Sequence, residues 1–297
     1  MKTWRWSFVL SRIPALALMV AAFVAVGMPP VVGAEIGVVF YDQRFGTLDD
    51  ATGAYTQVSN LPITSASAGL TGLNGLYYLE DLGNNLFTVD PLTGAASKVG
   101  SSGMNLDAAA FAGTSTGLFE VDQASNLYSI NAATGAATKV GATGIAPANQ
   151  QYDTSMSGDG TWLYYTAGLG GQTDELYRID VLTGIATDLG NTGVRGVAGS
   201  ALVGGELELF QYGQAQNYIY SAIAGSASFT QGAQLASAAQ IIDGGALLLS
   251  TDEGTQWATP EPNTFLLAGT ALLSAGVALR RRIQRRKIPA PVRVRSG

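Results

Sequence analysis

The side chains best suited to chemistry in this sequence are its carboxylates. The chain has 22 Asp and Glu residues and contains neither Cys nor His. Ser-His-Asp and Cys-His catalysis are therefore excluded, and so are zinc sites built from His and Cys. A pair of carboxylates could still hydrolyse a glycosidic bond if the fold placed them at the right separation.

The local patterns around the acidic residues favour structural roles. Asp90 and Asp180 recur at the same turn position of a repeat, and no acid has the Asp-x-Asp-x-Asp-Gly spacing of a calcium loop. The segment SGDGTW at 157–162 has the glycines and the acid of a tight β-turn. We therefore predict no catalytic residue, no metal site and no cofactor, and we do not expect an enzyme.

The charges are distributed unevenly along the chain. Residues 35–279 contain 5 basic residues and all 22 acidic ones, which gives this part a net charge of −17. Such a body repels nucleic acid and anionic membrane surfaces, so we expect no nucleic-acid partner. Because there is no Cys, packing and hydrogen bonds must hold the domain together without disulfides.

Residues 1–34 have the pattern of a secretory signal peptide. Three basic residues stand at or before residue 12, an apolar run covers 14–27, and the small-residue sequence VGA ends at Ala34. This order predicts cleavage between Ala34 and Glu35. An uncleaved membrane anchor is the alternative, although the apolar run is short for a span of about 20 residues.

A repeat organises residues 35–251. Its clearest unit is LYRIDVLTGIATDLG at 176–190, in which Asp starts a turn and Thr-Gly leads into a second strand. The intervals between the turn glycines are 41, 41, 49 and 41 residues, so the long interval indicates an eight-residue insertion. The five turn glycines are Gly53, Gly94, Gly135, Gly184 and Gly225.

Two further strands are expected before each hairpin. The stronger candidates lie at 75–81, 117–122 and 161–167, and the weaker ones at 63–69, 107–113 and 155–160. About four strands per 41 residues is the size of a propeller blade. A strand from 238–251 would complete the N-terminal blade and protect both sheet edges.

The predicted fold is therefore an all-β propeller of five four-stranded blades, followed by one C-terminal transmembrane helix. Six blades are the alternative if the leftover strands form a mixed blade, and a β-helix or other solenoid is the competing fold. The repeat at 176–190 resembles those of many bacterial secreted propellers of undefined activity. This resemblance implies the architecture and leaves the function open.

The eight extra residues could lie in a loop at 144–153 or at 167–175. Insertions in repeat arrays often carry a binding surface, and the first loop combines polar and aromatic side chains. A sugar or another protein is the contact that such side chains suit, whereas a tolerated loop beside a core Trp is the alternative. The candidate residues are Asn149, Gln150, Gln151, Tyr152 and Trp162.

The C-terminal part divides into three segments. Residues 252–263 are polar and contain a Pro-Glu-Pro triplet, which predicts a linker. Residues 264–287 are expected to form a transmembrane helix with a basic cluster, and 288–297 a cytoplasmic tail. Arg residues directly after the apolar run indicate that the tail stays inside and that the body faces outward.

Three features of this region resemble the PEP-CTERM sorting signal in order and spacing. They are the triplet Pro260, Glu261 and Pro262, the apolar run at 265–279, and the cluster Arg280, Arg281 and Arg282. The resemblance implies recognition by an exosortase, a membrane-embedded protease of exported proteins in bacteria that make exopolysaccharide. It also implies transient residence in the inner membrane, cleavage near the triplet, and delivery to the cell surface or the extracellular matrix.

These features together predict a sorted, exported propeller that acts as a non-enzymatic binding or structural module. Its expected partners are an exosortase and either exopolysaccharide or another surface protein. One alternative is a carboxylate-dependent, glycan-active enzyme on the same scaffold. Another is a binding protein that stays anchored in the membrane because the tail is never cut.

Overall fold

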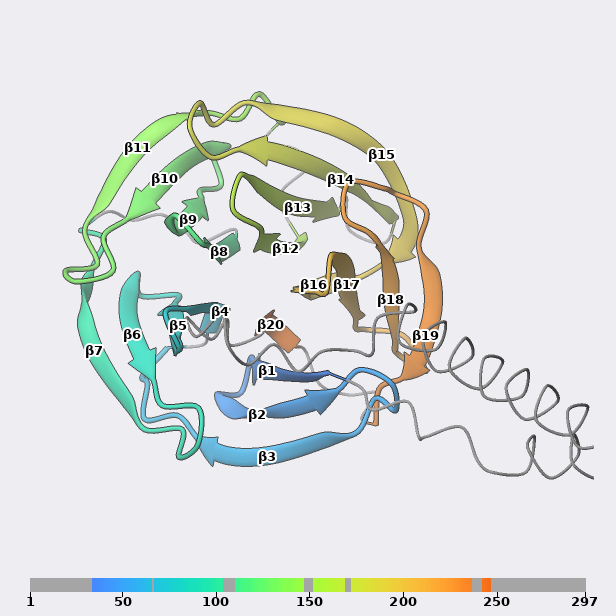
Figure 1. Cartoon of the computed structure of the whole chain (residues 1–297), viewed down its shortest axis with the longest axis horizontal. Coiled ribbons are helices and arrows are strands. Elements are labelled where there is room, and N and C mark those ends of the chain that lie inside the picture. Colours follow the sequence, from blue (N-terminus) through green and yellow to red (C-terminus); the bar gives the residue numbers. More distant parts are fainter. Residues whose placement is uncertain are drawn as a thin grey trace, which may run out of the picture. The chain divides into compact units, whose positions relative to one another are not determined.

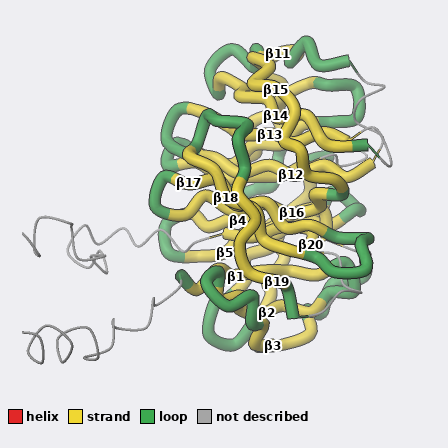
Figure 2. The backbone as a smooth tube through the Cα atoms, turned by 90° about the vertical axis from the view of Figure 1, so that its right-hand side faces the viewer, coloured by secondary structure: helices red, strands yellow, loops and turns green. Residues whose placement is uncertain are grey.

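The computed structural model describes residues 34–65, 67–103, 110–146, 152–168, 172–236 and 242–246. Within these ranges, twenty β-strands form five four-stranded antiparallel sheets arranged in a ring (Figure 1). This confirms the predicted all-β propeller and settles its blade number at five. Seen from the side, the connections between strands gather at the two faces of the ring (Figure 2).

The blades follow one another along the chain, and each contributes four strands from the centre outward. Their bounds are β20 (Ile242–Ala246), β1 (Glu35–Phe40), β2 (Arg44–Asp49) and β3 (Tyr55–Asn60) in blade 1; β4 (Ser67–Leu73), β5 (Leu76–Asp81), β6 (Asn85–Val89) and β7 (Ala96–Ser101) in blade 2; β8 (Ala110–Thr114), β9 (Gly117–Val121), β10 (Asn126–Ile130) and β11 (Ala137–Ala142) in blade 3; β12 (Tyr152–Gly158), β13 (Trp162–Gly168), β14 (Thr173–Asp180) and β15 (Ala186–Arg195) in blade 4; and β16 (Val197–Val203), β17 (Glu206–Gln211), β18 (Tyr218–Ile223) and β19 (Thr230–Gln234) in blade 5.

The ring closes as the sequence predicts, through a strand from the end of the domain. β20 pairs antiparallel with β1, with Gly37 opposite Ala246 and Phe40 opposite Ile242. Blade 1 therefore combines the first three strands of the domain with its last one. Since the pairing occupies the inner edge of β1, neither end of the repeat array leaves that edge open.

The core lies between neighbouring blades, because both faces of each sheet are covered. The strands next to the centre consequently have continuous buried runs, as in β9, where four consecutive residues after Gly117 are buried. One cluster joins blades 3 and 4 through Leu163 and Tyr165, which are both fully buried. At about 25 cal/mol per Å² of apolar surface, burial on both faces is the main stabilising contribution for a domain without disulfides.

The hairpin turns have the predicted chemistry. Oδ1 of Asp90 accepts hydrogen bonds from the amides of Leu92 and Thr93, at 3.0 and 2.8 Å. Asn131 and Asp180 make the equivalent bonds in blades 3 and 4. All five turn glycines have a positive φ, between 66° and 89°, which confirms the expected left-handed conformation.

These turns also fasten each blade to the one before it, a role that the sequence did not reveal. The turn glycine of blade 3, Gly135, lies against Gly100 and Ser101 at the outer strand of blade 2. Gly94, Gly184 and Gly53 meet the preceding blade in the same way, the last one contacting Gln234 of blade 5. We call this contact the glycine clasp. It is missing at Gly225, where the repeat is degenerate and no atom would lie within 4 Å of an added Cβ.

Two expectations about the inner strands need correction. The candidate strand at 63–69 begins later, at Ser67, since residues 63–65 are not in a strand, whereas residues 107–109 of the candidate at 107–113 lie outside the described residues. The longer interval of blade 4 is spread over strands and is not confined to one loop. β12, β13 and β14 have 7, 7 and 8 residues, where β8, β9 and β10 have 5 each.

Candidate functional site

Of the candidate contact residues of blade 4, the structure places only Trp162 and the backbone of Tyr152. Asn149, Gln150 and Gln151 lie outside the described residues, as does the side chain of Tyr152. Tyr152 begins β12 opposite Gly168, whereas Trp162 is the first residue of β13. The length of β13 separates these two positions by roughly 20 Å at about 3.3 Å per residue.

Trp162 instead packs within its own blade. The guanidinium carbon of Arg178, on the neighbouring strand β14, lies 4.3 Å from the centre of the indole ring. Trp162 is half-buried, and it packs against the apolar cluster between blades 4 and 5. This environment matches the alternative of a packed Trp, with Arg178 covering the ring as a cation–π partner.

Replacing Arg178 tests the strength of this contact. We expect Arg178→Ala to lower the free energy of unfolding by about 1 kcal/mol, since a partly exposed cation–π pair contributes on this order. Urea denaturation followed by tryptophan fluorescence would measure the loss. Arg195→Ala removes the same charge from an exposed position of blade 4 and should change the stability by less than about 0.5 kcal/mol. Equal losses in the two variants would contradict the contact.

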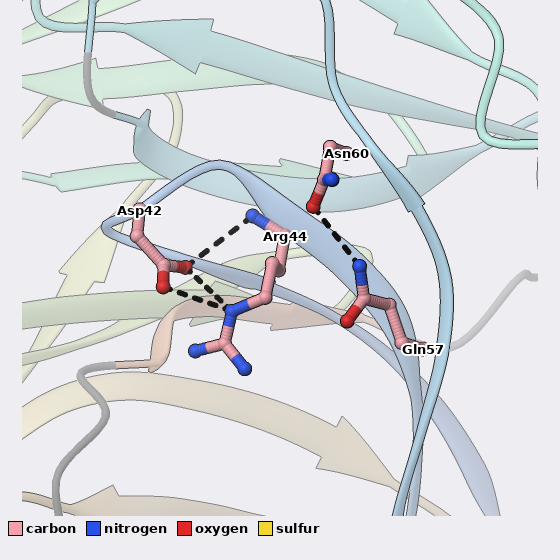
Figure 3. Close-up of polar contacts among 4 residues, drawn as sticks. All are labelled: Asp42, Arg44, Gln57 and Asn60. Atoms are coloured by element: carbon pink, nitrogen blue, oxygen red, sulfur yellow. Dashed lines mark hydrogen bonds and ion pairs between the residues drawn. The ribbon is translucent and has the colours of Figure 1, made fainter.

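A small polar cluster in blade 1 illustrates how the few cations are used (Figure 3). Nε of Arg44 donates to both carboxylate oxygens of Asp42, at 2.9 and 2.8 Å. The same guanidinium lies 4.7 Å from the centre of the Phe40 ring, which in turn contacts Tyr55 edge-on at 4.7 Å. Nearby, Gln57 donates to Asn60 within β3. These contacts stabilise the turn between β1 and β2, and they occupy the Arg44 guanidinium with Asp42 and the Phe40 ring.

Several acidic side chains are explained by the turns that they stabilise. Oδ1 of Asp159 accepts from the amides of Thr161 and Trp162, both at 2.8 Å, as predicted for a tight turn at 157–162. Asp81 ends β5 of blade 2 and Asp122 directly follows β9 of blade 3, and each accepts from the amide of an Asn four residues later. Such carboxylates satisfy backbone donors and need no ligand.

A different arrangement occurs between blades 2 and 3. Glu80 of β5 and Glu120 of β9 are 1 % and 0 % exposed, and their carboxyl groups lie close enough to change each other's pKa. No N–H or O–H of another residue reaches either oxygen of Glu120 or Oε2 of Glu80. Burial raises the pKa of both carboxyl groups, and the neighbouring Glu80 raises the pKa of Glu120 further, whereas the contact with Glu120 lowers that of Glu80. We call these two residues the interblade carboxyl pair.

A second contact of this kind lies where blade 5 meets blade 1. Glu208 of β17 lies close to Asp50, which follows β2, and the two carboxyl groups change each other's pKa. Burial raises the pKa of Glu208 to about 8, and the neighbouring charge of Asp50 adds to this. Asp50 also accepts a bond of 2.8 Å from the amide of Ala34, next to the predicted cleavage position. Glu35 follows as the first residue of β1.

Neither contact is open to a substrate in this structure, because Glu80, Glu120 and Glu208 are all buried. One feature of the sequence could have predicted the interblade carboxyl pair. In GLFEV at 117–121, Glu120 stands inside an apolar run in which both faces of the strand are covered, so no exposed face was left for it. A carboxyl group in such a position must find a partner on the adjacent blade.

The described residues contain no group of three or more acidic side chains placed to hold a metal ion. Over the same ranges, no helix has both the length and the apolar character that a membrane crossing requires. The predicted transmembrane segment at 264–287 lies outside the described residues, as do all the predicted sorting residues. Those residues are Pro260, Glu261, Pro262, Arg280, Arg281 and Arg282.

Comparison with known proteins identifies the C-terminal segment. Residues 258–282 match the PEP-CTERM protein-sorting motif. A search among curated proteins gave no match. Among solved structures, a chain in the crystal structure of a nidogen/laminin complex is similar, with 9 % sequence identity and a TM-score of 0.49. The similarity covers 73 % of this chain and 98 % of that one.

The chain thus carries a PEP-CTERM sorting motif behind a five-bladed propeller. The motif implies an exported surface protein that is anchored transiently in the membrane and processed by an exosortase. The matched residues include both the Pro-Glu-Pro triplet and the three Arg residues that follow the apolar run.

Proposed function

We propose that the propeller is a non-enzymatic binding or structural module, released from its membrane tether by an exosortase-type protease and deployed on the cell surface or in an exopolysaccharide matrix. The observation that carries this proposal is the position of ring closure. β20 ends at Ala246, whereas the sorting motif begins at residue 258. Cleavage near the Pro-Glu-Pro triplet would therefore leave every strand of the ring in the released product.

The charge of the body supports release into the surroundings. A net charge of −17 over residues 35–279 gives little affinity for anionic lipid once the basic tail is removed. The described acids support the non-enzymatic role, because those in the turns accept from backbone amides and those between the blades are buried away from any substrate. Asp90, Asp159 and Asp180 accept from backbone amides, while Glu80 and Glu120 face one another.

Intact-mass measurement of the secreted protein tests the sorting step. In a bacterium that contains an exosortase, we expect a product that starts at Glu35 and ends near Pro260. Replacing the triplet by Ala (Pro260→Ala, Glu261→Ala, Pro262→Ala) should abolish this product and leave a membrane-bound chain. Glu253→Ala, outside the matched residues, is the control and should be processed normally. A wild-type protein that keeps its full C-terminus would contradict sorting and leave a permanent anchor.

The role of the released propeller needs a separate measurement with the host's own exopolysaccharide. A binding module should sediment with the polymer and leave its length and its number of reducing ends unchanged. Shortening of the polymer, with turnover lost on replacement of a single acid, would instead favour the glycan-active enzyme. Failure to bind would leave the structural role, which predicts altered matrix cohesion in a deletion strain.

A further inference from the structure

In the interblade carboxyl pair, no donor reaches either oxygen of Glu120 or Oε2 of Glu80. Glu80 and Glu120 come from adjacent blades, and both are almost completely buried. Two residues before each of them, Tyr78 and Leu118 pack in one apolar cluster between blades 2 and 3. Because side chains two apart in a strand point to the same face, both Glu side chains also point into this seam.

The charged and titratable groups around the pair do not neutralise it. Asp81 lies near Glu80 and raises its pKa, and Asp122 does the same for Glu120. The hydroxyl of Tyr128 donates to Asp122 at 3.2 Å, and Tyr78 lies on the face of β5 that carries Glu80.

The basic residues described in these two blades stand farther out. They are Lys98 and Lys139, which belong to the outer strands β7 and β11. Lys98 donates to the side chain of Asn85 at 2.7 Å. The remaining described acid of these blades, Asp90, is engaged in its exposed hairpin turn.

Two carboxylates in contact, buried and without a cation or donor, cannot both be ionised at an acceptable cost in free energy. One of the two groups must therefore keep a proton, and this proton can bridge the two carboxyl groups as a hydrogen bond. We propose that this shared proton joins blades 2 and 3, so that the seam is tight in acid and neutral solution and loosens in alkaline solution. The inference concerns the propeller alone and does not depend on the sorting of the chain.

The direction of the effect follows from proton linkage. Both carboxyl groups have a raised pKa in the folded protein, relative to the ordinary value of 4.5. The folded state therefore keeps a proton that the unfolded chain has already released, and stability falls as the pH rises through the folded pKa. The contribution of the pair is complete below the unfolded value and declines between about pH 5 and pH 9.

Thermal unfolding of the secreted protein at pH 5, 7 and 9 tests the proposal. In Glu120→Gln, the amide can donate to the Glu80 carboxylate, so the bond no longer needs a proton. We expect Tm of the wild type to fall between pH 5 and pH 9 by about 5 °C more than Tm of the variant. Asp188→Asn removes one charge from an exposed position and should keep the wild-type pH dependence.

The comparison also separates this pair from the contact between Asp50 and Glu208. That second contact remains in both proteins, so only the difference between wild type and Glu120→Gln reports on the seam of blades 2 and 3. Parallel pH profiles of these two proteins would overturn the proposal. So would a Ca²⁺-dependent rise in the wild-type Tm at pH 9 that Glu120→Gln lacks, because a cation would then hold the pair.

Infrared spectroscopy gives a second test that needs no variant to fold. A carboxylic acid has a C=O stretching band distinct from the bands of a carboxylate. The folded wild type at pH 7 should show this band, and alkali should remove it as the seam loosens. Its absence at pH 7, where an ordinary Glu is ionised, would overturn the shared proton.

Discussion

Deletion of β20, residues 242–246, is expected to abolish cooperative unfolding of the propeller. The deletion removes the inner strand of blade 1 and its pairing with β1. It also removes Gly245, which fits so closely against Phe210 of blade 5 that an added Cβ would lie 2.5 Å from the ring. The loss is of the order of 5 kcal/mol or more, which equals the whole stability of many domains.

Circular dichroism during heating would show the result as a broad transition at lower temperature. A deletion of equal length at 252–256, in the predicted linker, provides the matched control and should leave the transition unchanged. A synthetic peptide that covers 238–251 should restore the sharp transition of the first variant by adding the missing strand. A sharp transition in that variant without the peptide would show that the ring does not need its closing strand.

The sequence predicted the repeat because the evidence for it is local, and it predicted the closure because strands are left over at both ends of the repeat. Each hairpin has its own turn residues, and the glycine intervals reveal the repeat even where the strands are weak. The sorting motif was equally predictable from the sequence, since such a motif is recognised as a linear segment and needs no tertiary contact. In both cases, residues close together in the chain carry the whole pattern.

What the sequence did not predict depends on the neighbouring blade. The inner strand of blade 2 begins at Ser67, later than expected, and a strand covered on both faces lacks the alternation of polar and apolar residues that would mark its start. Glu80 could not be matched with Glu120, since the two are brought together by the angle between blades. The position of Trp162 relative to Tyr152 likewise depends on strand pairing, which sets Tyr152 opposite Gly168, at the other end of β13 from Trp162.

The glycine clasp also depends on the neighbouring blade. Among such contacts, it is the one at which a single added methyl group is expected to lower the stability most. Gly135→Ala should lower the free energy of unfolding by about 3 kcal/mol, for two reasons. Its φ of 76° is unfavourable for Ala, at a cost of about 1–2 kcal/mol. In addition, the new Cβ would lie 2.9 Å from both the carbonyl carbon of Gly100 and the amide nitrogen of Ser101.

Blade 5 supplies a control for the first of these two reasons. Gly225 has a φ of 89°, and nothing lies within 4 Å of an added Cβ, so Gly225→Ala has the backbone cost without the collision. Urea denaturation of both variants should give a loss of about 1–2 kcal/mol for Gly225→Ala, with the remainder in Gly135→Ala assigned to the clasp. Equal losses would mean that turn geometry alone explains the glycine at each hairpin. A larger loss at Gly135 would show that the same residue both turns the chain and joins two blades. This double role explains why the repeat is regular where the clasp exists and degenerate at Gly225, where it does not.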